Sequence, residues 1–357
     1  MELLHKRFIG YVRSNLPDKE LAHEACGIQK YRIKCFCREA AIEYVDIIED
    51  YGYKDDCRKK EKGLATELGV PELKDKYIPE GWGKILGTIV HNEIDVIIVD
   101  TKMRLAINER YATIINRLCT ENGVTIMEIP AINAPENPED RIYLYHCTNN
   151  PAKRCGVVIN DIDEMYIYAT SLKGEVAGLF VDMEFRDRIQ LENAVNACGQ
   201  GTLVVKNYLH LKRFTGASFA VFKQIEESGG RIISQEEGYL RSLDKETINK
   251  LKLSQIRVAF YDSHLHKYDL DNKELEIQKV KAYIRCNTSG WILDTDDIYV
   301  DEYGFKKQRR LEELISKQDM YGLIIIDSYP RLSKDISRFM KIVKRIHIPI
   351  YSMKEEF

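Results

Sequence analysis

Three apolar runs of strand length end in the same pattern of side chains that could do chemistry. Each run is followed at once by a charged residue, and four positions further on stands a basic residue with a leucine behind it. The charged residues are Asp100, Lys206 and Asp327, and the basic residues are Arg104, His210 and Arg331. At a helix start, the two arginines could hold a phosphate together with backbone donors and the helix dipole. They could instead form ion pairs with Asp100 and Asp327 that stabilise the fold, and such pairs are common.

Two basic runs are the strongest candidates for a nucleic-acid contact. One contains Arg58, Lys59 and Lys60, and the other contains Lys306, Lys307, Arg309 and Arg310. The chain carries a formal net charge of −3 and has a pI of about 6.3, so its overall field does not attract nucleic acid. Binding to DNA would therefore depend on these local patches, and the alternative is ordinary solvated loop charge.

Strands that alternate with helices position these residues. In the first part of the chain, strand-like runs are expected at 7–12, 44–48, 94–100 and 124–129, with a lysine-rich insertion at 55–81. Between the last two runs, Tyr111, Ile114, Ile115 and Leu118 have helical spacing, and Gly123 is typical of a helix end. This alternation predicts an α/β fold with a mostly parallel four-stranded sheet and helices on both faces.

The same plan returns twice along the chain. We expect strands of a second repeat at 156–159, 177–181, 203–206 and 231–234, and strands of a third repeat at 256–261, 297–300 and 323–326. A second shared segment follows the second strand of each repeat: 50–54, 182–186 and 302–306, each with acidic, aromatic and basic positions in that order. Repetition at this period predicts tandem domains at 1–130, 154–236 and 256–357, joined by linkers at 131–153 and 237–255. The first linker contains a strand-like run at 141–145.

Three segments resemble the catalytic domain of resolvase/invertase-type serine recombinases. That family opens with a strand ending in Tyr-x-Arg-x-Ser, which residues 8–14 resemble through Tyr11, Arg13 and Ser14. Its Leu-x-x-Gln helix is similar to residues 275–278, and its third-strand motif is similar to residues 330–335. The resemblance implies three tandem Rossmann-like, resolvase-like domains. It also implies a serine nucleophile that attacks a DNA phosphodiester while arginines stabilise the charge on the phosphate.

The chain departs from this family at the positions that would do the chemistry. The nucleophile position falls on Asn15, and Ser14 stands one residue early, which in an extended segment turns the side chain to the opposite face. Arg104 and Arg331 match the first arginine of the third-strand motif, whereas Lys334 stands at the second. The long dimer helix and the DNA-recognition helix of active members are not visible in the sequence.

These departures predict a catalytically degenerate recombinase-like pseudoenzyme, a binding, regulatory or accessory component linked to DNA recombination or mobile elements. One alternative is an active recombinase or nicking enzyme that uses Ser14, Arg13 and Arg104. The other is a phosphate- or nucleotide-binding module that uses the third-strand turns, with Arg331 and Lys334 among its residues. We expect another protein or DNA as the partner and allow for a homo-oligomer.

Cysteine usage and hydropathy set the remaining expectations. Nine cysteines at scattered positions favour a reducing compartment over a disulfide framework, and their spacing does not match a zinc site. No apolar run approaches 18 residues, and the first residues lack the apolar core of a signal peptide. We therefore expect a cytoplasmic chain with no membrane span, no bound metal and no cofactor.

Overall fold

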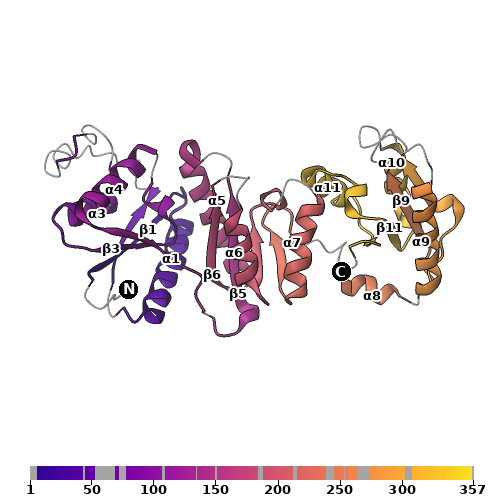
Figure 1. The fold of residues 1–357 in the computed structure, drawn as a ribbon, viewed down its shortest axis with the longest axis horizontal. Helices are drawn as coiled ribbons and strands as arrows, with labels where there is room; N and C mark the ends of the chain where they lie inside the picture. The colour runs from indigo at the N-terminus through magenta and orange to yellow at the C-terminus, as the bar shows by residue number, and fades with distance from the viewer. Residues whose placement is uncertain are drawn as a thin grey trace. The chain divides into compact units, whose positions relative to one another are not determined.

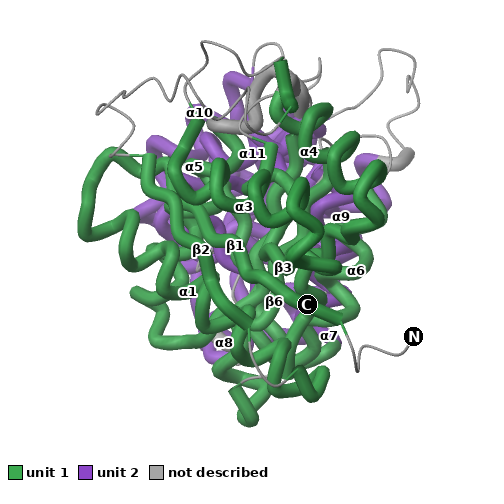
Figure 2. The backbone as a smooth tube through the Cα atoms, turned by 90° about the vertical axis from the view of Figure 1, so that its left-hand side faces the viewer, with its two compact units in different colours: residues 1–206, 228–231 green, residues 207–227, 232–357 purple. Residues whose placement is uncertain are grey.

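The computed structural model divides into two compact units, residues 1–206 with 228–231 and residues 207–227 with 232–357 (Figure 2). The structure describes residues 6–42, 45–52, 69–71, 78–106, 109–133, 135–148, 151–183, 188–211, 215–238, 245–252, 254–263, 273–301 and 308–355. Within these residues the strands form three four-stranded sheets. We call the sheets, with their helices, repeats 1, 2 and 3.

Repeat 1 has the strand order β2-β1-β3-β4, and all of its pairs are parallel. Its strands are β1 (Phe8–Ser14), β2 (Asp46–Tyr51), β3 (Val96–Val99) and β4 (Thr125–Glu128), and its helices are α1 (Lys19–Glu39), α3 (Glu80–Val90) and α4 (Glu109–Asn122). Asp18 begins α1 by accepting a hydrogen bond from the Leu21 amide. Ile9 and Tyr11 of β1 join the core formed with α3 and α4, whereas Gly10 lies next to Ile33 of α1. The sheet is thus covered by α1 on one face and by α3 and α4 on the other (Figure 1).

Repeat 2 has the strand order β6-β5-β7-β8, with β5 parallel to both β6 and β7. Its strands are β5 (Arg141–Cys147), β6 (Glu175–Asp182), β7 (Thr202–Val205) and β8 (Arg231–Ser234), and its helices are α5 (Pro151–Ser171), α6 (Ile189–Cys198) and α7 (Thr215–Glu227). The segment predicted as a linker at 131–153 therefore contains the first strand of repeat 2. The strand predicted at 156–159 is wrong, because those residues belong to α5.

Repeat 3 has the strand order β10-β9-β11-β12, again with parallel pairs. Its strands are β9 (Val258–Ser263), β10 (Ile298–Asp301), β11 (Leu323–Ile326) and β12 (Ile350–Ser352), and its helices are α9 (Lys273–Ser289), α10 (Arg309–Ser316) and α11 (Ile336–Val343). A short helix, α8 (Lys245–Leu251), precedes β9. The four residues of β11 are all fully buried, as expected for a central strand covered on both faces.

The three sheets share one register. In each first strand, the residue two positions after a tyrosine pairs with an aspartate at or next to the end of the second strand. The pairs are Arg13 with Asp50, Cys147 with Asp182, and Ser263 with Asp301. Asp301 is therefore the counterpart of Asp50. The alignment of 302–306 with 50–54 expected from the sequence is one residue out of register with the sheets. The predicted α/β class with three parallel four-stranded sheets and flanking helices is confirmed, in an arrangement consistent with Rossmann-like folds.

Candidate functional site

A buried tyrosine–aspartate pair sits at the carboxyl end of the first two strands in every repeat. The tyrosine hydroxyl donates to the aspartate, from Tyr11 to Asp50 at 2.7 Å, from Tyr145 to Asp182 at 2.9 Å, and from Tyr261 to Asp301 at 3.1 Å. Each aspartate also accepts two backbone N–H groups from the first residues of the next helix, which are Gly81 and Trp82, Gln190 and Leu191, and Arg310 and Leu311. The aspartate therefore satisfies two of the donors that a helix start leaves open and complements the helix dipole.

The environment of this pair keeps the tyrosines protonated. Burial raises the pKa of Tyr11, and the neighbouring Asp50 raises it further. Burial also raises the pKa of Asp50, although the hydrogen bond from Tyr11 and the amides of Gly81 and Trp82 oppose that shift. A proton held this firmly is poorly suited to acid–base work, so the pair locks the strand ends to the helix.

The second recurring structure is the turn after the third strand. A short 3-10 helix stands there in each repeat, η3 (Lys102–Arg104), η5 (Tyr208–His210) and η10 (Tyr329–Arg331), and each ends at the basic residue identified from the sequence. The leucine that follows in each repeat is buried. In repeats 1 and 3 this tight turn brings the arginine side chain at its end back toward the aspartate four positions earlier.

In repeat 1 this geometry uses Arg104 for ion pairing. Its Nε donates to both carboxylate oxygens of Asp100 at 3.1 and 3.2 Å, and its Nη2 donates to Oδ2 of Asp100 at 3.0 Å. Its Nη1 donates to Oδ1 of Asp163 at 2.6 Å and to the backbone oxygen of Arg13 at 2.8 Å. Arg104 is 0% exposed. The ion-pair interpretation offered by the sequence is therefore confirmed for Arg104, with Asp163 of α5 as an additional partner.

Two further side chains complete what we call the buried ionic cluster, formed by Arg32, Asp100, Arg104, Asp163 and Tyr166. The Tyr166 hydroxyl donates to Asp100 at 3.0 Å and accepts from Nη1 of Arg32 at 2.9 Å. Burial alone would lower the pKa of Arg104, but the charges of Asp100 and Asp163 outweigh it and raise that pKa. Burial raises the pKa of Asp163 above its usual range, although Arg104 opposes this shift. Two cations face two carboxylates, so the cluster is electrically balanced.

Ser14 and Arg13 lie beside this cluster. Both are buried, Ser14 completely. The Ser14 side chain hydrogen-bonds to Asp163 and also accepts the Leu16 amide at 3.3 Å. Nε of Arg13 donates to Oδ1 of Asn15 at 2.8 Å. The structure therefore brings Ser14, Arg13 and Arg104 together, but the carboxylate of Asp163 occupies the space between Ser14 and Arg104.

The equivalent positions differ in the other two repeats. In repeat 3, Nε of Arg331 lies 3.4 Å from Asp262 and 3.6 Å from Asp327, and its Nη1 donates to the Ser263 backbone oxygen at 3.0 Å. Arg331 is buried, so the ion-pair interpretation holds there as well. In repeat 2 the strand-end residue is Lys206, which pairs with Asp161 at 3.7 Å and also with Glu164, while His210 is half-buried.

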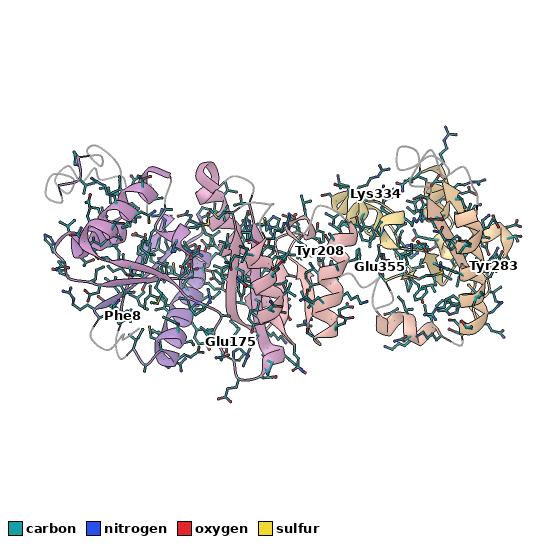
Figure 3. The ribbon with its side chains drawn as sticks, in the orientation of Figure 1. Phe8, Glu175, Tyr208, Tyr283, Lys334 and Glu355 are labelled. Atoms are coloured by element: carbon teal, nitrogen blue, oxygen red, sulfur yellow. The ribbon has the colours of Figure 1, made fainter. Side chains whose placement is uncertain are left out.

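A glutamate caps the third-strand turn in every repeat. The backbone N–H of the first residue of each turn donates to a carboxylate at the end of the fourth strand or three residues beyond it: Lys102 to Glu128 at 2.6 Å, Tyr208 to Glu237 at 3.1 Å, and Tyr329 to Glu355 at 3.0 Å. Figure 3 labels Tyr208 and Glu355. A phosphate at this turn would need these donors, and the protein's own carboxylates already occupy them.

The predicted basic residues fall into three groups. Arg58, Lys59, Lys60, Lys306 and Lys307 lie outside the described residues. Arg309, Arg310 and Lys334 are exposed, the last labelled in Figure 3, whereas Arg331 is buried.

Gln308 brings the segments that carry Arg309 and Lys334 close together in repeat 3. Its amide nitrogen donates to the Leu332 backbone oxygen at 2.7 Å, and its Oε1 accepts from Arg338 at 2.8 Å. Arg309 follows Gln308 in sequence and Lys334 lies two residues after Leu332, so both stand close to this junction. Arg310 pairs with Glu313 at 2.6 Å.

A cavity of about 400 Å³ lies in the first compact unit, between repeats 1 and 2. Its wall includes Asp100, Lys102, Glu128, Phe180 and Met183. Among the described residues, no group of three or more His, Cys, Asp or Glu side chains could hold a metal ion. No helix in the described part of the chain is long and apolar enough to cross a membrane.

The sequence missed Asp163, Tyr166 and Arg32, because nothing in their local spacing indicates that helices α1 and α5 meet. It also missed Tyr145, for which a signal existed: a tyrosine near the end of a strand-like run, as at Tyr11 and Tyr261. Comparison of the sequence with protein-family models and with curated proteins gives no match.

Proposed function

We propose that this chain is a catalytically degenerate, recombinase-like protein that acts as a non-enzymatic binding or regulatory component in DNA recombination or the biology of mobile elements. The observation that carries the proposal is the closed ion pair of Arg104 with Asp100 and Asp163 directly beside Ser14. The resemblance of residues 8–14, 275–278 and 330–335 to serine recombinases supplies the connection to DNA, and the shared strand register supports three tandem resolvase-like domains.

Electrostatics at Ser14 oppose catalysis. A serine that attacks a phosphodiester needs cationic groups free to stabilise the phosphate. Here the guanidinium of Arg104 already serves two carboxylates and a backbone oxygen, and the Asp163 carboxylate stands next to the Ser14 hydroxyl. A DNA phosphate at this position would face an anion in a buried site, where like charges repel strongly.

The two alternative functions meet specific obstacles. An active recombinase would require α5 to leave repeat 1, which would break the ion pair of Arg104 with Asp163 and expose the rest of the buried ionic cluster to solvent. A phosphate-binding module at the third-strand turns would require Glu128, Glu237 and Glu355 to give up the backbone donors that they occupy.

A covalent-trapping experiment tests the non-enzymatic assignment. The full chain is incubated with supercoiled and with nicked DNA, denatured, and examined for a protein–DNA adduct. Wild type and Ser14→Ala should give equal, background signals. An adduct formed by the wild type and lost in Ser14→Ala would refute the assignment.

A binding experiment tests the connection to DNA separately. Any non-specific contact should use exposed cations such as Arg309 and Lys334, so an Arg309→Gln/Lys334→Gln variant should lower the slope of log K against log salt by about 0.9 per lost phosphate contact. Lys223→Gln is the matched control, because Lys223 is 52% exposed and already pairs with Glu227 on α7. If the wild type fails to bind DNA at low salt, the partner is a protein and the link to DNA fails.

A further inference from the structure

Each repeat places an equivalent helix after its first strand, namely α1, α5 and α9. Within two residues after each helix stands a residue with left-handed backbone: Ala41 at φ 54°, Lys173 at φ 61° and Gly290 at φ 74°. In repeats 1 and 3 the next residue closes the same turn, since the Ile42 amide donates to Cys37 and the Trp291 amide donates to Cys286. These landmarks align α9 with α1 at an offset of 249 residues (290 − 41).

The burial pattern supports this alignment. The positions of α1 that are buried against its own sheet include Cys26, Gln29, Ile33 and Cys37, and the offset carries them to Leu275, Gln278, Ala282 and Cys286. All four of those residues are buried in α9. The two helices therefore lie on their sheets through the same face, and their outer faces can be compared position by position.

In the first compact unit α5 covers part of the outer face of α1, while Tyr31 on that face stays 37% exposed and its hydroxyl donates to Glu175 of β6. Arg32 of α1 hydrogen-bonds to Tyr166 of α5, and Thr170 of α5 hydrogen-bonds to Glu24 of α1 at 2.8 Å. Ile28 of α1 packs into the core of repeat 2. Along α1 the contacts move from 24 to 32 while along α5 they move from 170 to 166, so the two helices run antiparallel.

This pairing is nearly two-fold, because it joins two equivalent helices. With Lys173 placed on Ala41, the offset is 132 (173 − 41), so Tyr166 matches Lys34 and Thr170 matches position 38. The two contacts then have midpoints at 33 and 31 in the numbering of α1 (half of 32 + 34 and half of 24 + 38). Those midpoints correspond to Ala282 and Val280 in α9.

The outer face of α9 has the apolar residues for such a pairing, and among the described residues these side chains stay exposed. The α1 positions Ile28, Tyr31 and Cys35 correspond to Ile277, Val280 and Ile284, which are 55%, 55% and 58% exposed. Their spacing of three and four residues puts them on one stripe. The described residues include nine exposed large apolar side chains, and three of them lie on this one face of α9. The stripe is therefore an exposed apolar patch, which single scattered side chains would not form.

We propose that a second copy of this chain covers the stripe, and that α9 pairs antiparallel with α9 of that copy around a two-fold axis near Val280. Of the three equivalent helices, α1 and α5 pack against each other. The third, α9, can form the same kind of pair with α9 of a second copy. A two-fold interface joins the same patch on both subunits, and an apolar stripe centred on the axis is self-complementary.

Sedimentation velocity of the full chain tests the proposal. Since one helix pair makes a small interface, we expect a reversible monomer–dimer equilibrium at about 1–100 µM protein. Val280→Glu should weaken dimerisation at least ~100-fold, because a substitution near the axis buries two like charges at once. Ile189→Glu is the matched control, because Ile189 is 64% exposed on α6 and should leave the equilibrium unchanged. Circular dichroism and thermal midpoints should show that both variants remain folded.

A cross-linking experiment tests the register. Val280→Cys should form a disulfide-linked dimer under mild oxidation because two residues near a two-fold axis face each other, whereas Ile189→Cys should not. A wild type that stays monomeric over the whole concentration range overturns the proposal, and then the stripe serves a different partner. A dimer that survives Val280→Glu, or that fails to cross-link through Val280→Cys, overturns it as well, because its interface lies elsewhere.

Discussion

Replacing Arg104 by methionine separates a structural from a functional role for this residue. Methionine fills most of the volume but leaves the Asp100 and Asp163 carboxylates buried without their cation. Both carboxylates have 0% side-chain exposure, so solvent cannot replace the lost charge. Removal of one partner from a buried ion pair costs about 3–5 kcal/mol. We therefore expect Arg104→Met to reduce the free energy of unfolding of the first compact unit by about that amount.

Urea unfolding followed by tryptophan fluorescence measures this loss. Trp82 reports on repeat 1, since its indole N–H donates to the Leu105 backbone oxygen at 2.9 Å, directly after Arg104. A Trp291→Phe background removes the signal from repeat 3, which unfolds within a different compact unit. Arg331→Met, read through Trp291 in a Trp82→Phe background, should cost less because its ion pairs are longer, at 3.4 and 3.6 Å.

A double-mutant cycle confirms the source of the effect. Asp163→Leu removes the second carboxylate, so the combination with Arg104→Met should be less destabilising than the sum of the single variants by about 1–3 kcal/mol. Loss of less than about 1 kcal/mol in Arg104→Met, or strict additivity in the cycle, would contradict the closed ion pair. Arg104 would then be available for a ligand.

Three further predictions concern the recurring contacts and the buried thiols. Tyr11→Phe, Tyr145→Phe and Tyr261→Phe should each lower the free energy of unfolding by a similar amount, about 1–3 kcal/mol, because each removes one hydrogen bond to a buried carboxylate; clearly unequal losses would show that the repeats are not equivalent. Burial raises the pKa of Cys26 to about 12, whereas an unfolded thiol ionises near about 8.5. The contribution of the protonated Cys26 thiol to the free energy of unfolding is fully present below about pH 8.5. As pH rises from there toward 12, the free energy of unfolding should fall by up to about 1.4 kcal/mol per pH unit, and Cys26→Ala should remove this dependence on pH in urea titrations. Glu355→Ala should lower the free energy of unfolding of repeat 3 by about 1–2 kcal/mol, because the Tyr329 N–H loses its hydrogen-bond acceptor. Glu227→Ala on the surface of α7 is the control and should have little effect.

Much of the fold could be predicted because the central strands are short apolar runs with sharp ends. The runs at 96–99, 202–205 and 323–326 are buried on both faces, so their composition alone identifies them. The position of Arg104 and Arg331 relative to their strands followed from the repeated spacing. The choice between a phosphate and an ion pair remained open, because one 3-10 turn presents the side chain equally well to either.

Repeat 2 was the hardest to delimit, and the reason is local composition. Strand β5 follows a proline- and asparagine-rich stretch, and α5 begins at Pro151, so both elements stand in a sequence typical of a linker. The apolar run at 156–159 predicts a strand, but these residues belong to α5, where Val158 and Ile159 are buried in the core of repeat 2. Further along, at Tyr166 and Thr170, α5 also contacts α1. A helix covered on two sides loses the one-sided pattern that distinguishes it from a buried strand.

The sequence similarity between 50–54 and 302–306 shows why a motif alone could not settle the site. Its alignment is one residue out of register with the sheets, since the hydrogen bonds to the following helix select Asp301 as the counterpart of Asp50. The third-strand turn has the same ambiguity: Arg104 and Arg331 occupy equivalent positions, yet Asp163 reaches Arg104 from another repeat while Asp262 reaches Arg331 from its own. What such an arginine does is decided by the residue that faces it across the turn. In repeat 1 that residue is Asp163, whose carboxylate also hydrogen-bonds to Ser14. The turn is therefore part of the packing between repeats 1 and 2.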